Sequence, residues 1–267
     1  MIRLLFTKRW LGYLALTVVF SVVSSFFGLW QWDRREQAVA AITTLESNWD
    51  REPQALAALV GGAEFSATEN QWVPVVITGQ YVTEDQILVR TRPRGGQVGF
   101  EVLVPLRTEQ GINVVVNRGW IPTGDASDFP DVVPPAPGGE VSVLARIKPG
   151  EPTLRGRGAP DGQLPSIDLP AMEQIVGYDL ETTFFLLVDS EDPQPSVAPL
   201  PGLRPVLDEG PHLSYTLQWF VFALLAITAF VALLRQEARR EAGIEPRVKK
   251  KKTDADEEDA LLDRAKV

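Results

Sequence analysis

Two long stretches without a formal charge dominate this sequence. Residues 10–32 contain no Asp, Glu, Lys or Arg, and neither do residues 210–234, where His212 is the only side chain that titrates near neutral pH. At about 1.5 Å per helical residue, stretches of this length cross the apolar core of a bilayer, which is about 30 Å thick. They predict two transmembrane helices that flank one long central segment.

The basic residues indicate how these helices are oriented. Arg3, Lys8 and Arg9 precede the first stretch, and eight Lys and Arg side chains follow the second between residues 235 and 252. Because Lys and Arg concentrate on the cytoplasmic side, both termini are expected in the cytoplasm. The segment between the helices has 13 basic and 26 acidic residues and is expected outside. The predicted order, in a plasma membrane protein, is a cytoplasmic N-terminus (1–9), a helix (10–32), an extracytoplasmic domain (33–209), a helix (210–234) and a charged cytoplasmic tail (235–267).

An alternative for the first stretch is a cleaved signal peptide, with Ala38-Val39-Ala40 resembling a cleavage site. The apolar stretch is longer than the core of a signal peptide, and four charged residues separate it from that site. A retained helix is therefore favoured.

The composition excludes several kinds of chemistry. The 267 residues include no Cys and one His, so zinc, iron–sulfur and copper sites built from clusters of these residues are excluded. A net charge of -9 argues against a nucleic-acid binder, because phosphate binding needs a surplus of Lys and Arg. The sequence also lacks a paired-acid motif, a nucleophile elbow and a Gly-rich phosphate loop, which disfavours an enzyme.

The central segment has the pattern of a mostly antiparallel sheet. Six short runs rich in Val, Ile and Leu are bounded by turn residues, at 72–81, 86–92, 98–106, 112–120, 140–147 and 182–188. The first helix is expected to continue past the membrane, with a break near Ser47 or Pro53, and a short helix is expected at 169–176 after Asp168. Six prolines within 190–211 predict an extended strap. The fold class is α+β, with two membrane helices around a barrel- or sandwich-like domain.

Five short motifs resemble a known family. They are GLWQWDR at 28–34, PVVITGQY at 74–81, LVRTRP at 88–93, VNRGWIP at 116–122 and HLSYTLQWF at 212–220. In this order, between two apolar helices, they resemble the Surfeit-locus cytochrome c oxidase assembly factors, and the chain looks like a bacterial member. The resemblance implies a non-enzymatic factor that assists delivery or insertion of haem a into the catalytic subunit of a terminal oxidase. That subunit and the lipid bilayer are the implied partners, with haem a synthesis enzymes as further candidates.

Two rival functions stay open beside this resemblance. One is a stable accessory subunit of a respiratory oxidase complex, and the other is a membrane-tethered extracytoplasmic enzyme. A transient assembly factor would copurify with the oxidase in substoichiometric amounts, whereas a subunit would be present at one copy per complex.

The outer end of the second helix carries the first group of candidate residues. His212, Tyr215 and Trp219 are expected on one helix face. His212 is the only side chain that can offer an imidazole to haem iron, and aromatic rings would flank a planar apolar ligand. The structural alternative is an interfacial anchor at His212 and an aromatic belt formed by Tyr215, Trp219 and Trp30.

The outer end of the first helix carries the second group. Gln31 and Arg34 are expected at the membrane interface, where Arg34 could bind a haem propionate or extend to lipid headgroups. Small residues at Ser21, Ser24, Ser25 and Gly28 would let another helix approach closely. That helix could be the second span or a helix of the oxidase.

Arginines in the sheet form the third group. Arg90, Arg92 and Arg94 alternate along a predicted strand, which would project all three to one face, and Arg118 lies in the run 112–120. In a domain of net charge -13, such a cluster is either paired with local acids or left to bind an anion. Arg90, Arg92 and Arg118 are therefore candidate cofactor-binding residues, with internal pairing as the structural alternative.

Overall fold

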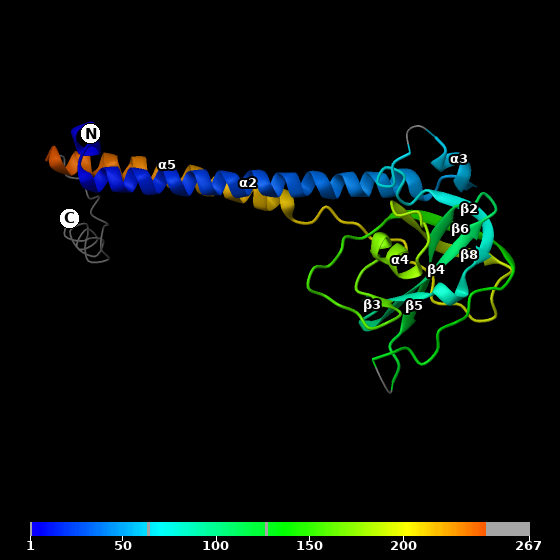
Figure 1. Cartoon of the computed structure of the whole chain (residues 1–267). Coiled ribbons are helices and arrows are strands. Elements are labelled where there is room, and N and C mark those ends of the chain that lie inside the picture. Colours follow the sequence, from blue (N-terminus) through cyan, green and yellow to red (C-terminus); the bar gives the residue numbers. More distant parts are fainter. Residues whose placement is uncertain (1, 63–64, 126–127, 244–267) are drawn as a thin grey trace, which may run out of the picture. The chain divides into compact units, whose positions relative to one another are not determined.

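The computed structural model describes residues 2–62, 65–125 and 128–243, and the chain divides into two compact units (Figure 1). One unit combines the residues up to Arg35 with those from Gly210 onward, and the other contains Glu36–Glu209. The predicted charged cytoplasmic tail spans residues 235–267, and its residues after 243 lie outside the described ranges.

The first unit consists of helices. They are α1 (Ile2–Leu5), the first part of α2 (Lys8–Trp49) and α5 (His212–Glu241). Both α2 and α5 contain an apolar window long enough to cross a membrane. Apolar side chains such as Leu16, Phe26 and Leu224 are exposed on these helices, which favours a lipid environment over water. The two long apolar helices predicted from the sequence are thus present, and α2 ends between the two expected break points.

The apolar parts of α2 and α5 pack against each other along small residues. Ser24 is buried, and a Cβ added at Gly28 would lie 3.1 Å from the ring of Phe220. The hydroxyl of Ser21 donates a hydrogen bond to the carbonyl of Ala223 over 3.5 Å. The sequence left two partners open for these small residues, the second span or a helix of the oxidase. The structure shows the second span, α5, packed against them.

The second unit is built around a β-barrel-like sheet (Figure 1). Its strands are β1 (Gln54–Ala55), β2 (Pro74–Tyr81), β3 (Ile87–Arg94), β4 (Gln97–Thr108), β5 (Asn113–Pro122), β6 (Glu140–Pro149), β7 (Gln163–Leu164) and β8 (Phe184–Asp192). They pair in the order β1-β2-β6-β8-β5-β4-β3-β7, and β4 also pairs with β2, which closes the sheet. The pairings of three or more residues are antiparallel, whereas the two-residue pairings β1–β2, β3–β7 and β5–β8 are parallel. The six predicted strands are confirmed, with ends shifted by a few residues.

The long strand β4 makes this closure possible. Its first half pairs with β3, and its last residues, Leu106–Thr108, pair with Gly79–Tyr81 of β2. A Cβ at Gly79 would collide with the carbonyl oxygen of Arg107, so only glycine allows the two strands to meet this closely.

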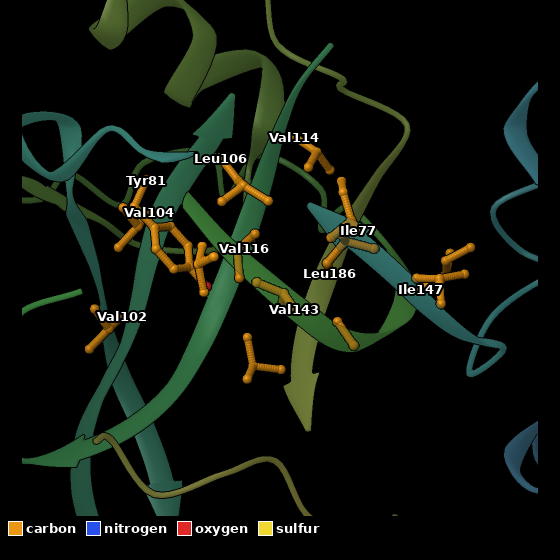
Figure 2. Close-up of a cluster of buried hydrophobic side chains, with 14 of the residues drawn as sticks. Ile77, Tyr81, Val102, Val104, Leu106, Val114, Val116, Val143, Ile147 and Leu186 are labelled. Atoms are coloured by element: carbon orange, nitrogen blue, oxygen red, sulfur yellow. The ribbon is translucent and has the colours of Figure 1, made fainter. Parts of the chain in front are cut away.

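Two apolar clusters fill the second unit. Figure 2 shows the larger one, where side chains including Val104, Val116, Val143 and Leu186 from four strands lie together. The smaller cluster lies under helix α4 (Leu169–Val176), which contributes the fully buried Met172. The carboxylate of Asp168 accepts a hydrogen bond from the amide of Ala171, so the predicted helix and its N-cap are confirmed. The sequence did not predict β1, β7, the 3-10 turn η1 (Thr83–Asp85) or the short helix α3 (Leu56–Val60).

Candidate functional site

The only histidine of the chain contacts the opposite apolar helix. His212 is the first residue of α5, and its Nδ1 lies 2.8 Å from Oε1 of Gln31 on α2. Because a carbonyl oxygen can only accept, this contact requires the proton on Nδ1, which in a neutral ring leaves the lone pair on Nε2. Both side chains are half-buried. The structure therefore brings together His212 and Gln31, which were predicted as separate candidates at the ends of the two helices.

The opposite edge of the His212 ring lies beside a glycine. Gly210 has a φ of +67°, and a Cβ added to it would lie 3.3 Å from both Nε2 and Cδ2 of the ring. A side chain at this position would crowd the ring, so glycine allows the chain to pass close to the Nε2 edge of the imidazole. The sequence analysis did not single out Gly210, because the closeness of the two groups depends on how the chain enters α5.

Aromatic rings continue this helix interface. Trp219, two turns after His212, stacks on Phe27 of α2 with a centroid distance of 5.0 Å and an interplanar angle of 27°. Phe222 meets the same indole edge-on at 5.8 Å. The helix pair thus places flat apolar surfaces on the side of α5 that carries His212. For Trp219, this confirms the prediction from helical spacing that it lies on the same side as His212.

Tyr215 lies at the exposed edge of this face, and its place in the site stays a prediction. Its side chain is 45% exposed, whereas its neighbour Thr216 is buried against α2. Three residues turn a helix by about 300°, which leaves Tyr215 about 60° away from His212. Trp30 is also exposed, and the guanidinium of Arg34 lies 5.9 Å from its ring centroid, as in a cation–π pair.

The three alternating arginines of β3 do not share one face, so that prediction is also wrong. The register between β3 and β4 shifts between Val89 and Arg92, and Thr91 has a φ of +61°. One extra residue in a β-bulge reverses the alternation of side chains. Arg90 therefore lines a hollow of about 800 Å³, together with Asp125, Asp128 and Asp131. Arg92 and Arg94 line a different hollow of about 290 Å³.

Arg92 is paired within the domain. Its Nε lies 3.1 Å from Glu101, and its Nη2 lies 2.5 Å from Glu151. Burial raises the pKa of Glu101, since the loss of hydration outweighs the attraction of Arg92, and burial lowers the pKa of the nearby Lys148. The guanidinium of Arg94 donates hydrogen bonds to the carbonyls of Leu200 and Pro201 in the proline-rich strap, over 3.2 and 2.7 Å.

Arg118 is the most buried of the candidate arginines. Its side chain is inaccessible to solvent, its Nε and Nη2 donate to the two oxygens of Glu191, and its Nη1 donates to the carbonyl of Pro134. The hydroxyl of Tyr81 donates to Glu191 over 2.7 Å, and burial, followed by the charge of Glu191, raises the pKa of Tyr81. Internal pairing, the structural alternative, is what the structure shows for Arg92 and Arg118.

The acids that bind these arginines were missed from the sequence. Glu101 is the only charged residue in the apolar run 98–106, and a lone acid in a buried strand is a usable signal for an internal partner. Glu191 offers no such signal, because it lies beside Asp192 at the end of β8. Its role depends on the pairing of β8 with distant strands.

Comparison with known proteins shows which family the sequence is similar to. The sequence model of the SURF1 family matches residues 18–224. The chain is 31% identical over 255 residues to uncharacterized SURF1-like proteins of Mycobacterium bovis and Mycobacterium tuberculosis, covering 91% of this chain and 92% of each relative. It is 25% identical over 232 residues to a SURF1-like protein of Monosiga brevicollis, covering 82% of this chain and 86% of the relative.

Proposed function

This chain belongs to the SURF1 family, known in general terms as oxidase assembly factors, and on that basis we propose that it assists haem a delivery or insertion into the catalytic subunit of a haem–copper oxidase. The proposed place is the plasma membrane, with both termini in the cytoplasm and the barrel domain outside. The observation that carries the haem proposal is the position of His212 at the contact of the two apolar helices, where its Nδ1 is hydrogen-bonded to Gln31 and its Nε2 has no hydrogen-bond partner among the described residues.

The residues around His212 fit a haem in their chemistry. A neutral imidazole with a free Nε2 is a haem ligand, and Trp219 and Phe27 supply flat apolar surface for a macrocycle. Elsewhere in the described ranges, no group of three or more His, Asp or Glu side chains could hold a metal ion. Haem a, once delivered, supplies the electron-transfer and oxygen chemistry of the oxidase, so the assembly factor needs only reversible binding.

Each residue of the helix pair has a separate part in this proposal. His212 would offer Nε2 as a ligand to the haem iron, and Trp219 would contribute ring contact and exclude water. Arg34, with its charge beside Trp30, would bind a propionate at the membrane interface. Tyr215 is exposed and would anchor α5 among lipid headgroups.

We assign the arginines of the barrel a structural part. Arg92 and Arg118 already satisfy acids of their own domain, and a haem propionate would have to displace those acids. Arg90 faces three aspartates around its hollow, which disfavours a second anion there.

Deletion of the gene tests the proposed function. Membranes of the deletion strain should lose haem a absorbance and oxidase activity, while the apoprotein of the catalytic subunit is still made. Wild-type protein should restore both, and His212→Ala should not. Normal haem a content in the deletion strain would contradict the proposal, and a constant one-to-one ratio with the purified oxidase would favour the rival of a stable subunit.

A further inference from the structure

A single hydrogen bond orients the His212 ring. Within the part of the chain that the structure describes, the bond from Nδ1 to Gln31 is the only one that the imidazole makes. The two residues are 181 positions apart, so this bond exists only while α2 and α5 are paired. Its geometry therefore links the protonation pattern of the ring to the association of the two helices.

The packing of the next helical turn holds Gln31 in place. Phe27 and Gly28 precede Gln31 by four and three residues, so all three lie on one side of α2. Phe27 stacks on Trp219, and Gly28 approaches the ring of Phe220 so closely that an added Cβ would lie 3.1 Å away. These contacts fix the rotation of α2 and direct the Gln31 amide toward His212.

The other ring nitrogen has no hydrogen-bond partner among the described residues. With the proton on Nδ1, the lone pair of a neutral ring is on Nε2, beside Gly210, where an added Cβ would lie 3.3 Å away. The hydrogen bond with Gln31 is therefore the contact that sets the position of the ring proton.

From this geometry we infer that Gln31 is a positioning residue, which holds the proton of His212 on Nδ1 and so keeps Nε2 as the ligand nitrogen. The inference rests on the proposed function for its purpose, but the hydrogen bond can be tested without haem. An imidazole that gives its second N–H to a carbonyl oxygen has a fixed tautomer and a fixed ring plane, and it is a more basic ligand. Without such an acceptor the proton can occupy Nε2, where it blocks coordination.

Because His212 is the only histidine in the chain, its tautomer can be measured directly. The full chain, with ¹⁵N-labelled histidine, is reconstituted in lipid nanodiscs without haem at mildly alkaline pH, where imidazole rings are neutral. Proton–nitrogen correlation spectra then show which ring nitrogen carries the proton. We expect one dominant tautomer, protonated on Nδ1. A proton on Nε2 in the wild-type protein would overturn the inference.

Two substitutions at Gln31 and one control complete the test. Gln31→Leu removes the acceptor at similar volume and should allow the Nε2–H tautomer to appear, whereas Gln31→Glu keeps an acceptor and should keep the proton on Nδ1. Gln218→Leu removes an exposed glutamine of α5 that makes no hydrogen bond with His212. This control should leave the spectrum unchanged. An unchanged tautomer in Gln31→Leu, or an equal change in Gln218→Leu, would contradict the inference.

Titration with haem a separates this inference from the proposed function. Substitution of a residue that supports a metal ligand typically lowers affinity about 10- to 100-fold, and we expect a loss of that size for Gln31→Leu with recovery in Gln31→Glu. If the tautomer follows Gln31 but the wild-type protein binds no haem, the positioning role stands and the haem role fails. If haem binds equally well to all variants, the haem role stands and the positioning role fails.

Discussion

Arg118 of β5 and Glu191 of β8 form a two-armed ion pair inside the barrel, with Nε–Oε1 and Nη2–Oε2 distances of 2.8 and 3.0 Å. These two strands run parallel and are paired only at Val116 with Leu186 and at Asn117 with Leu187. The ion pair therefore adds side-chain bonds where the backbone ladder is only two residue pairs long.

Removal of one partner of this pair should destabilise the protein strongly. Arg118→Met leaves Glu191 buried without its cation, and we expect a loss of about 3–5 kcal/mol in the free energy of unfolding. Urea unfolding of the full chain in detergent, followed by tryptophan fluorescence, measures it. Arg90→Met is the control, because Arg90 lines an open hollow and should cost much less. Equal losses in the two variants would contradict the structural role of Arg118.

Glu101 should make stability depend on pH. Burial raises the pKa of Glu101 in the folded protein. Its protonated form therefore stabilises the folded state fully below the unfolded pKa, about 4.3, and this stabilisation is lost as the pH rises through the folded pKa. Glu101→Gln should therefore gain stability relative to wild type as the pH rises from acid to neutral, since Arg92 keeps Glu151. The exposed Glu109→Gln should show no such gain. A Glu101→Gln protein whose stability relative to wild type stays constant or falls as the pH rises would refute this.

The proline-rich strap should detach when Gly119 acquires a side chain. Trp120 and Leu200 exchange two backbone hydrogen bonds of 2.8 Å, and a Cβ at Gly119 would collide with the carbonyl of Leu200. Gly119→Ala should therefore raise hydrogen exchange at Leu200. Gly139→Ala also introduces positive-φ strain, about 1–3 kcal/mol, but a Cβ there meets no atom within 4 Å, so this variant should leave the strap protected. Loss of protection in both variants would mean that strain alone releases the strap.

Reporter fusions should establish the topology. Enzymes that are active only outside the cytoplasm should work when fused at Asp125 or Asp161 and fail at Lys250, because basic residues precede the first predicted span and follow the second, which places both termini in the cytoplasm. A cytoplasmic signal from Asp161 would contradict the arrangement of two spans around an outer domain.

Local patterns predicted most of the fold. Alternating apolar runs located six strands, and Asp168 before an apolar run located α4. The closure of the barrel could not be predicted, because it depends on contact between Gly79 and Arg107, which are far apart in the sequence. The bulge at Thr91 could not be predicted either, since threonine rarely adopts a positive φ. Because of this bulge, the prediction that the three arginines share one face was wrong.

The site was predictable only within each helix. Helical spacing placed Trp219 on the side of His212, but the hydrogen bond of His212 with Gln31 depends on the relative rotation of two helices. That rotation is fixed by the stacking of Phe27 on Trp219 and by the close approach at Gly28. Nothing in the separate helix sequences determines it.

The most direct measurement of the central claim is the absorption spectrum of the full chain purified from cells that make haem a. We predict bound haem a in the wild-type protein and none in His212→Ala, which should still insert into the membrane because one residue hardly alters a span of this length. Trp219→Ala should bind haem a more weakly, since it loses ring contact but no axial ligand. A full haem a spectrum in His212→Ala, or a wild-type protein without haem a, would contradict the assignment of His212 as the haem ligand.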